Sequence, residues 1–248
     1  MPKRTEEELF VETNYKILYE DDFFLVADKP SPLPVHAVGR FKEKNLLSFL
    51  KRDLGARGEG LRIVNRLDSE TSGLVIAAKD SASAGKLGLL FEKRQVYKEY
   101  RAIVLGVPEA RKGNISVSLG TDGANLHNIR VPDPNGQTAS TDYEVLESGK
   151  HGAVLKIIPH TGRTHQIRAH LAFLGYPIYG DKIYIDARIF ERYIVEGWQE
   201  DMLDTVKAKR LCLHAFKLEF EHPETGTAMT FTSPIPAYFK TITEMAIS

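Results

Sequence analysis

The amino-acid sequence predicts an α+β fold with a mixed, mainly antiparallel central sheet and flanking helices. Two observations lead to this prediction. Strand-like and helix-like segments are interspersed along the 248 residues without a regular strand–helix–strand repeat, and several strand-like segments are joined by short turns, as in hairpins. No internal repeat and no linker divides the chain. We therefore expect a single domain at residues 14–248, preceded by a polar, flexible arm at residues 1–13.

The first third of the chain predicts a hairpin, an extended segment and a short helix. Residues 16–27 contain two apolar stretches around a Glu-Asp-Asp turn, a pattern typical of a hairpin. Three prolines within residues 29–34 favour an extended path, because each proline fixes its own φ and biases its predecessor away from the helix. The apolar spacing at residues 46–50 indicates an amphipathic helix that ends at Gly55.

The central part predicts a second helix and several strands. Ser81 can cap a helix that carries the leucines of residues 87–91. Residues 97–105 are rich in strand formers, and residues 109–139 favour short strands joined by turns. Residues 141–158 have the pattern of a further hairpin.

The composition predicts an ordinary soluble, cytoplasmic protein. The chain is 42% hydrophobic and 27% charged, and no apolar run reaches the ~20 residues of a membrane helix. The N-terminus has no apolar signal core, so secretion is not expected. The single cysteine, Cys212, excludes an internal disulfide and a multi-cysteine metal site.

The net charge of zero argues weakly against a nucleic-acid binder, but the charge is unevenly distributed. Residues 40–66 contain eight basic side chains and three acidic ones. Such a stretch can guide a polyanion to one side of a protein, and it can equally be a solvated face.

The segment Val64–Leu74 presents an acidic side chain on a turn. Asp68 follows an arginine and a leucine, a Thr-Ser-Gly sequence comes three residues later, and an apolar strand resumes at Leu74. Taken alone, Asp68 fits a turn residue that accepts hydrogen bonds from nearby N–H groups. It also fits a functional carboxylate, because loops on rigid scaffolds often carry chemistry.

A second segment, Pro159–Leu171, combines histidines and arginines with a helix. Thr164, or alternatively Thr161, is expected to cap this helix, and Gly175 is placed to end it. The spacing i, i+4, i+7 predicts a buried stripe of Ile167, Leu171 and Leu174. Arg163 and Arg168 lie at or near the helix start, where cations oppose the helix dipole. They are better explained by a negative partner than by helix stability.

Metal and phosphate-loop sites are not predicted. The three histidines of residues 160–170 are spaced by five residues, which rotates them around a helix, and no carboxylate accompanies them. The chain contains neither G-x-x-x-x-G-K-[ST] nor G-x-G-x-x-G.

Three segments together resemble the RluA-type pseudouridine synthases. Those enzymes carry H-R-L-D-x-x-T-S-G-L, then K-x-Y-x-A-x-V, then T-G-R-T-H-Q-I-R-x-H-L, in this order. The corresponding segments here are Asn65–Leu74, Lys98–Val104 and Thr161–Leu171. Weaker matches occur at residues 28–36 and 175–181, and the resemblance spans about residues 15–235.

This resemblance implies a pseudouridine synthase fold with a catalytic cleft. It also implies an isomerase that converts specific uridines of ribosomal or transfer RNA to pseudouridine. The glycosidic bond breaks, the base turns, and a carbon–carbon bond to the ribose replaces it. Because no atoms are gained or lost, neither a cofactor nor a metal is implied. We expect RNA as the partner, no membrane, and a monomer.

The resemblance also assigns residues. Asp68 matches the catalytic carboxylate, which can act as nucleophile, base or electrostatic stabiliser. Arg168 matches its basic partner, which holds the carboxylate ionised and fixes its orientation. Tyr100 matches the tyrosine that can stack on the target base and assist proton movement. Further RNA contacts are expected from basic and polar side chains in or near these segments: Arg62, Arg66, Lys98, Arg163, His165 and Gln166.

The chain departs from the family pattern in several places. Asn65 replaces the usual histidine and is expected to alter a local hydrogen bond. Ser31-Pro32 replaces a small residue followed by glycine, which changes a turn. We expect no N-terminal S4-type RNA-binding domain. Two other functions remain open: a non-catalytic RNA-binding module with the same fold, and a hydrolase that uses Asp68 with Glu70.

Overall fold

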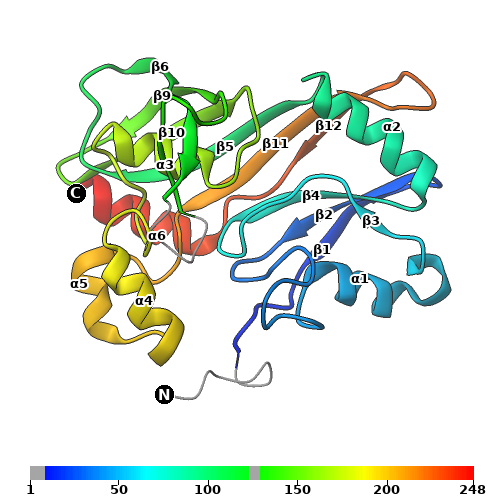
Figure 1. Ribbon diagram of the computed structural model, residues 1–248, viewed down its shortest axis with the longest axis horizontal. Coiled ribbons are helices and arrows are strands. Elements are labelled where there is room, and N and C mark those ends of the chain that lie inside the picture. Colours follow the sequence, from blue (N-terminus) through cyan, green and yellow to red (C-terminus); the bar gives the residue numbers. More distant parts are fainter. Residues whose placement is uncertain (1–8, 123–128) are drawn as a thin grey trace. The chain divides into compact units, whose positions relative to one another are not determined.

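The computed structural model describes residues 9–122 and 129–248 (Figure 1). The described residues form two compact units. Unit 1 comprises the described part of Met1–Lys98 together with Ala215–Pro234, and unit 2 comprises Glu99–His214 and Ile235–Ser248. The chain passes from one unit to the other at residues 98–99 and 214–215, each time within a strand, and at residues 234–235.

Unit 1 is a small sheet with one helix on each face. Its strand order is β1-β2-β4-β11, with β3 paired to β4 and β12 paired to β11. The pairs β1–β2, β2–β4, β3–β4 and β11–β12 are antiparallel. The elements are β1 (Lys16–Glu20), β2 (Phe24–Lys29), α1 (Leu46–Leu54), the 3-10 helix η1 (Gly55–Gly58), β3 (Arg62–Ile63), β4 (Ser72–Ala78), α2 (Ser81–Glu92), β11 (Leu213–Glu221, from Ala215 onward in this unit) and β12 (Ala228–Thr232).

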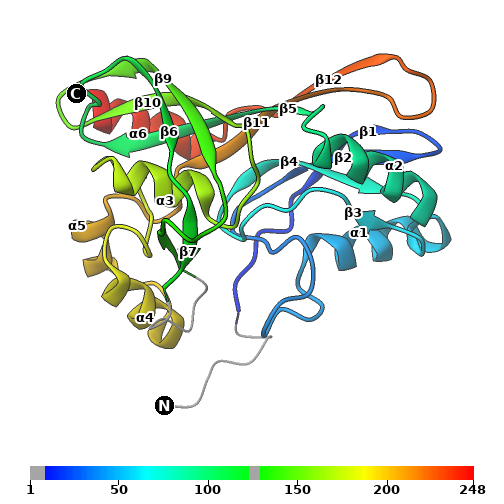
Figure 2. The same cartoon turned by 45° about the horizontal axis from the view of Figure 1, so that its top comes forward.

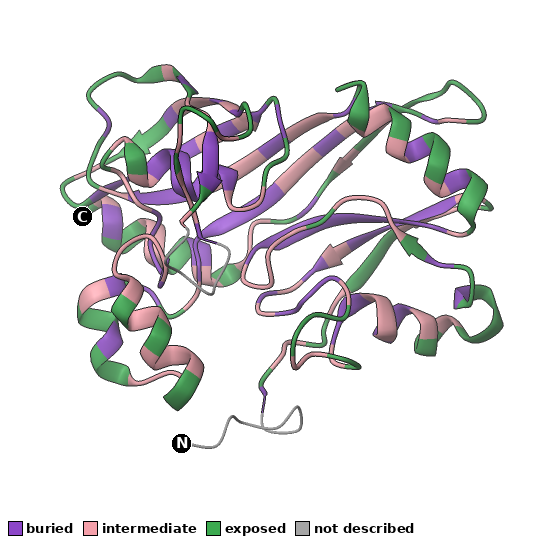
Figure 3. Cartoon of the chain, viewed as in Figure 1, coloured by how far each residue is buried: buried purple, intermediate pink, exposed green. Residues whose placement is uncertain are grey.

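Strand β4 is the centre of the unit 1 core. All seven of its residues are buried, and Figure 3 shows the strand purple along its length. Val75 and Ala77 pack with Leu50 of α1 on one face. Leu74 and Ile76 pack with Leu87 of α2 on the other. A strand covered on both faces is expected to be apolar throughout, which explains the unbroken apolar run in the sequence.

The caps of the two helices come from short polar side chains. The Asn45 side chain accepts a hydrogen bond from Ser48 N at 3.0 Å at the start of α1. The predicted cap at Ser81 is wrong by one position. Asp80 caps α2 by accepting from Ser83 N at 2.8 Å, and Ser81 is the first helical residue. Asp and Ser are both good caps, so their adjacency gave an ambiguous pattern.

Unit 2 contains a second sheet region with strand order β5-β10-β9-β6, in which neighbouring strands are antiparallel, and a separate antiparallel pair β7–β8. Figure 2 shows β7 beside α3. The elements are β5 (Tyr97–Leu105, from Glu99 onward in this unit), β6 (Lys112–Ser116), β7 (Leu119–Thr121), β8 (Arg130–Pro132), β9 (Ser140–Ser148), β10 (Gly152–Pro159), α3 (Gln166–Phe173), α4 (Ala187–Glu196), the 3-10 helix η2 (Glu200–Met202), α5 (Leu203–Val206) and α6 (Ala237–Ile247).

The unit 2 core joins α3 and α6 to the strands. Ile167 and Leu171 of α3 and Phe239 of α6 belong to one buried cluster with Leu155 and Ile157 of β10. The predicted buried stripe of α3 is therefore confirmed, and Gly175, with φ of 87°, follows the helix end as expected.

His170 of α3 is fully buried, and its two hydrogen bonds fit an uncharged imidazole ring. Its Nε2 donates to the Val117 carbonyl at 2.9 Å, so its Nδ1 accepts from the Thr141 hydroxyl, also at 2.9 Å. Burial lowers the pKa of His170, against a smaller opposing effect of the bond to Val117. The side chain thus ties α3 to the strand region as an uncharged group.

The fold class predicted from the sequence is confirmed, and so are most element positions. The hairpins at 16–27 and 141–158, the helix ended by Gly55 and the strand at 97–105 are all present. The short strands expected at 109–139 are present in the described part, while residues 123–128 lie outside it.

The N-terminal arm and the single domain stay predictions. Residues 1–8 lie outside the described part of the chain. Leu9 is buried, its carbonyl accepts from Lys44 Nζ at 3.0 Å, and Glu12 N donates to the Pro32 carbonyl at 2.9 Å. Within the described ranges, no helix is both long enough and apolar enough to cross a bilayer.

We predict that His170 makes the protein less stable in acid. Because the folded state holds His170 neutral, the unfolded state binds more protons below the ordinary histidine pKa, and stability falls as pH drops below about 6.5. His170→Gln keeps one donor and one acceptor but cannot titrate. Urea unfolding should show that the free energy of unfolding falls less steeply from pH 7 to pH 5 in this variant than in the wild type, by up to about 1.4 kcal/mol per pH unit. Equal slopes would contradict the assignment.

Candidate active site

Asp68 lies in the turn between β3 and β4 of unit 1. Its carbonyl accepts a hydrogen bond from Thr71 N at 3.1 Å, and its side chain is half-buried. Gly73, two residues after Thr71, has a φ of 110°, and a Cβ at this position would lie 2.2 Å from the Ala215 carbonyl oxygen. Only glycine fits this close approach of the two backbones. The chain can therefore enter β4 at Ser72–Gly73, directly after the turn.

Asn65 fastens the residues before Asp68 to β4. Its amide Nδ2 donates to the Leu74 carbonyl at 3.1 Å, and its Oδ1 accepts from Ile76 N at 2.7 Å. The side chain therefore binds an acceptor and a donor of the same strand, as a backbone segment would. These are the bonds that Asn65 makes at the position where the family pattern has histidine.

Lys29 and Ser31 fasten the residues after Asp68. Lys29 is fully buried, and its Nζ donates to the carbonyls of Leu33 at 2.7 Å, Pro30 at 3.1 Å and Ser69 at 3.1 Å. The Ser31 hydroxyl donates to the Glu70 carbonyl at 2.7 Å. The Asp68 turn is thus held on both sides, by Asn65 within the same segment and by Lys29 and Ser31 from about 40 residues earlier in the sequence.

Burial lowers the pKa of Lys29 to about 7, against the charges of Asp68, Asp28 and Glu70, which raise it. The three carbonyl acceptors match the three N–H bonds of an ammonium group. An uncharged amine has only two N–H bonds, so the lone pair of its nitrogen would face the third carbonyl oxygen, which is unfavourable. The geometry therefore favours the charged form of Lys29 at neutral pH, close to the Asp68 carboxylate.

In unit 2, Gln166 organises the loop before α3. Its Oε1 accepts from the Thr161 hydroxyl at 2.6 Å and from Arg163 N at 3.0 Å. Its Nε2 donates to the Ser140 carbonyl and to the Thr141 hydroxyl, both at 2.9 Å. Gln166 is buried, and all of these bonds hold the loop against β9.

The predicted helix caps Thr164 and Thr161 are wrong. Helix α3 starts at Gln166, and the residue at its N-cap is His165, which makes no side-chain capping bond. His165 has a φ of 54° and ψ of 14°, a left-handed conformation that costs a non-glycine residue about 1–2 kcal/mol. Such strain clusters at functional sites, where the surroundings enforce it.

Arg168 is held by Asp181, a residue for which the sequence predicted no role. Its Nε and Nη2 donate to the two carboxylate oxygens of Asp181, each at 2.8 Å. Both side chains are nearly inaccessible, with exposures of 7% and 0%. Burial alone would raise the pKa of Asp181, but the charge and hydrogen bonds of Arg168 and the N–H groups of Tyr184 and Ile183 hold it below its usual value.

A negative partner of Arg168 is therefore present within unit 2, while the pairing of Arg168 with Asp68 that the resemblance implies stays a prediction. Two signals pointed to Asp181. It ends the weaker matching segment at 175–181, and Arg168 needed an anion. Neither signal linked the two residues, which are 13 positions apart.

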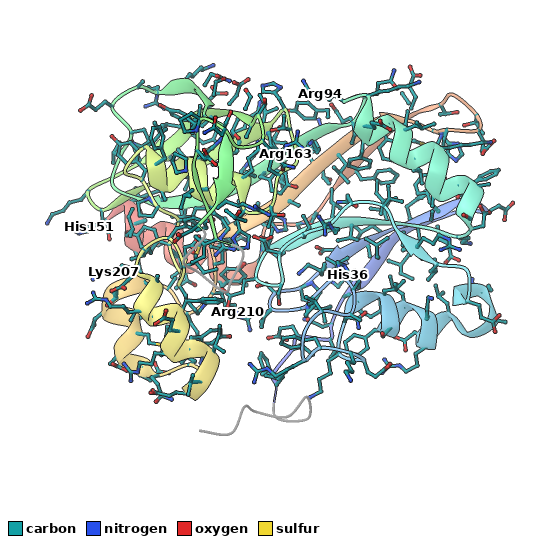
Figure 4. The ribbon with its side chains drawn as sticks, viewed as in Figure 1. His36, Arg94, His151, Arg163, Lys207 and Arg210 are labelled. Atoms are coloured by element: carbon teal, nitrogen blue, oxygen red, sulfur yellow. The ribbon has the colours of Figure 1, made fainter. Side chains whose placement is uncertain are left out.

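The other predicted site residues are accessible to different degrees. Tyr100 is half-buried on β5 and packs against the unit 2 core cluster. Arg62 and Arg66 are exposed in unit 1. Arg163 is exposed on the loop before α3, where its Nε donates to the Thr138 carbonyl at 3.2 Å (Figure 4).

Lys98 is half-buried in the last position of unit 1 before the chain enters unit 2. Burial lowers its pKa, and the charge of Arg94 adds to this effect. Arg94 follows α2 and has a φ of 58° (Figure 4). Over the described ranges, no cluster of three or more His, Cys, Asp or Glu side chains is arranged to hold a metal ion.

Comparison with known proteins identifies the family. The profile of the RNA pseudouridylate synthase family matches residues 23–173, which include the Asp68 turn, Tyr100 and Arg168. The chain belongs to the RNA pseudouridylate synthase family. Its members are RNA-modifying isomerases, so the family prediction made from the three sequence segments is confirmed. The matched range crosses the boundary between the two units.

Relatives of this pseudouridylate synthase cover most of the chain. It is 37% identical over 240 residues to an uncharacterized RNA pseudouridine synthase of Chlorobaculum parvum, covering 92% of this chain and 73% of the relative. It is 36% identical to the ribosomal large subunit pseudouridine synthase D of Pseudomonas aeruginosa (90% and 69% covered). It is 34% identical to the dual-specificity RNA pseudouridine synthase RluA of Escherichia coli (88% and 92% covered).

Solved structures agree with this family membership. Human RNA pseudouridylate synthase domain containing 1 superposes with a TM-score of 0.73 at 25% identity, covering 98% of this chain and 90% of the human one. Human RNA pseudouridylate synthase domain containing 4 gives 0.70 at 30% identity, covering 92% and 91%.

We predict that Asn65→Ala destabilises the synthase by about 1–3 kcal/mol, because Leu74 O and Ile76 N lose their partner beside a buried strand. Urea unfolding measures the change. Asn114→Ala is a matched control. The Asn114 side chain donates to the side chains of Ser140 and Asp142, but Asn114 is exposed, so that water can replace these bonds. It should change stability by less than about 0.5 kcal/mol. Equal effects of the two substitutions would contradict the role of Asn65.

Proposed function

We propose that this pseudouridylate synthase isomerises specific uridines in ribosomal or transfer RNA, with Asp68 as the catalytic carboxylate. The observation that carries the proposal is the Asp68 turn, whose sequence matches the family segment and whose backbone is held on both sides by Asn65, Lys29 and Ser31. A rigid turn presents its carboxylate without a further ordering cost when the substrate binds. The names of two relatives support this proposal: one is called ribosomal, which favours ribosomal RNA, and the other is called dual-specificity, which favours more than one RNA substrate.

In the proposed reaction, Asp68 acts at the uridine whose glycosidic bond breaks. Its charge is used as a nucleophile, as a base or to stabilise the electron-poor sugar or base. Arg168 supplies the positive charge that the sequence resemblance pairs with this carboxylate. Tyr100 stacks on the target base. All three groups retain the chemistry that the isomerisation needs, which favours an enzyme over a non-catalytic RNA-binding module.

We expect the RNA contacts to come from exposed and half-buried side chains. Arg66 helps to hold the flipped base, whose removal from the stack costs a few kcal/mol. Arg62, Lys98 and Arg163 contact phosphates, and His165 contacts the nucleotide next to them. Gln166 supports this group indirectly in our proposal, because its amide bonds shape the loop that carries Arg163 and His165.

The reaction is tested by incubating the purified protein with unmodified tRNA and ribosomal RNA. Pseudouridine is then mapped by carbodiimide labelling and primer extension, because the product has the same mass as the substrate. We expect new stops at defined uridines. Release of free uracil instead would favour the hydrolase that uses Asp68 with Glu70. Stops in none of the cellular RNAs would rule out the isomerase.

The catalytic carboxylate is tested by Asp68→Asn. We expect turnover to fall by at least about two orders of magnitude, as is usual when one member of a catalytic unit is removed. RNA affinity, measured by filter binding, should stay within about threefold, because an uncharged amide replaces a carboxylate of nearly the same shape and the proposed phosphate contacts come from other side chains. Glu70→Gln is the matched control and should retain activity. Residual Asp68→Asn activity close to wild type would contradict the assignment.

The phosphate contact of Arg163 is tested by salt dependence. Arg163→Gln should weaken binding to every RNA tested and reduce the slope of log K against log salt by about 1, the value for one lost phosphate contact. Arg188→Gln is the matched control. Arg188 has an exposed side chain on α4 paired with Asp186 at 2.7 Å. An unchanged slope for Arg163→Gln would contradict the contact.

A further inference from the structure

Asp181 and Tyr184 lie beside two of the proposed functional side chains of unit 2. Asp181 binds Arg168 through both carboxylate oxygens. Its Oδ1 also accepts from the backbone N–H groups of Ile183 and Tyr184, each at 3.0 Å. The same carboxylate therefore fixes a cation and shapes the turn that carries Tyr184.

Stability alone is a poor explanation for the Arg168–Asp181 pair. Taking two charges out of water costs several kcal/mol per ion, and buried ion pairs often add nothing over apolar side chains of similar volume. What two parallel hydrogen bonds do supply is orientation, because they match the planar guanidinium fork. A cation that must point in one direction during a reaction benefits from such a partner.

Tyr184 covers the other side of this cation. The guanidinium carbon of Arg168 lies 5.3 Å from the centre of the Tyr184 ring. Tyr184 also belongs to the small apolar cluster of Leu119, Ala139 and Ala169, which anchors the ring. The guanidinium group of Arg168 is thus fixed in two ways. Asp181 binds it within the guanidinium plane, and the Tyr184 ring stacks on the face of that plane.

The hydroxyl of Tyr184 reaches a second functional side chain. It accepts from Arg130 N at 3.0 Å and lies 3.3 Å from Nδ1 of His165, whose ring meets the tyrosine ring edge-on. Since the hydroxyl accepts from Arg130, its hydrogen can point to Nδ1. A hydrogen bond to Nδ1 selects the tautomer in which Nε2 carries the proton, which makes Nε2 of His165 a donor.

We propose that Asp181 and Tyr184 are positioning residues of the synthase: Asp181 and the Tyr184 ring orient Arg168 for the chemical step, and the Tyr184 hydroxyl sets His165 as a hydrogen-bond donor to the RNA. This inference rests on the proposed function. It predicts that the two halves of the network affect different kinetic constants. Changes that disturb Arg168 lower kcat, and changes that disturb His165 raise KM.

Asp181→Asn isolates the orientation of Arg168. The asparagine Oδ1 can keep the bonds from Ile183 and Tyr184, while the amide group that replaces Oδ2 cannot accept from Arg168 Nε. We expect kcat to fall about 10- to 100-fold, since small misplacements of a catalytic group cost this much, and KM to stay within about threefold.

Tyr184→Phe and Tyr184→Leu separate the hydroxyl from the ring. Tyr184→Phe removes the hydroxyl that binds His165, so KM should rise at least threefold. It keeps the ring over Arg168, so kcat should stay within about twofold of wild type. Tyr184→Leu removes the ring as well, so kcat should also fall at least tenfold. A fall in kcat for Tyr184→Phe as large as for Tyr184→Leu would overturn this division.

Two further measurements distinguish positioning from general loss of stability. Met202, fully buried in η2 and outside the Arg168 network, is replaced by alanine to give a destabilised comparator. Assayed well below its melting temperature, Met202→Ala should keep the wild-type kcat. In an Arg168→Lys background, Asp181→Asn should cost much less than in wild type, because it acts through the guanidinium fork. Full additivity, or an equal loss of kcat in Met202→Ala, would overturn the proposal.

An NMR measurement tests the same contact without any RNA. The Nε–H signal of Arg168 should exchange slowly with water in the wild-type protein and rapidly in Asp181→Asn. If both signals exchange alike, the orienting role of Asp181 is wrong whatever the activity. If the wild type modifies RNA and Asp181→Asn keeps its kcat, the positioning role is wrong and the proposed function stands. If the wild type modifies no RNA, the proposed function fails, and the kinetic roles of Asp181 and Tyr184 fail with it.

Discussion

Charges removed from water need fixed partners, and this constraint shapes both units around the candidate catalytic residues. In unit 1, the ammonium of Lys29 is fully buried and is surrounded by three carbonyl oxygens, one of which belongs to Ser69, next to Asp68. In unit 2, the carboxylate of Asp181 is fully buried and takes two hydrogen bonds from Arg168 and two from the backbone. Each buried charge therefore dictates the path of the chain around it.

This constraint connects the fold to the chemistry. The turn that carries Asp68 contains the backbone bond from Thr71 N to the Asp68 carbonyl, and Leu33 N donates to the Ser69 carbonyl. Side chains from residues 29–31 and from Asn65 add further bonds. The cation of Arg168 could sample many rotamers on a solvated helix, yet a carboxylate fork and an aromatic ring confine it. Ordering both groups before the substrate arrives lowers the entropic cost of the reaction. The free energy for this order comes from folding, through the apolar clusters around β4 and β10.

The sequence predicted what local patterns encode. Alternating and continuous apolar runs located the strands, and glycine and proline located the turns, including the turn at Asp68. The position of α3 and its buried stripe followed from the spacing of Ile167 and Leu171. The family followed from three ordered segments, and their match to the family profile confirms it.

The long-range polar contacts could not be predicted from the sequence, for a physical reason. Lys29 and Ser69 are 40 residues apart, and Asn65 binds two atoms of a strand that begins seven positions later. No periodicity marks such partners, because hydrogen bonds depend on the folded geometry and not on spacing. The predicted caps of α2 and α3 were wrong because several polar residues stand close together before each helix, and their spacing does not select one of them.

The proposed isomerisation of uridines in cellular RNA through Asp68 can be tested in cells. Pseudouridine maps of ribosomal and transfer RNA would be compared for the source organism, for a strain that lacks the gene, and for that strain carrying either the wild-type or the Asp68→Asn protein. We expect defined pseudouridines to disappear without the gene and to return with the wild type but not with Asp68→Asn. Identical maps in all four strains, or restoration by Asp68→Asn, would contradict it.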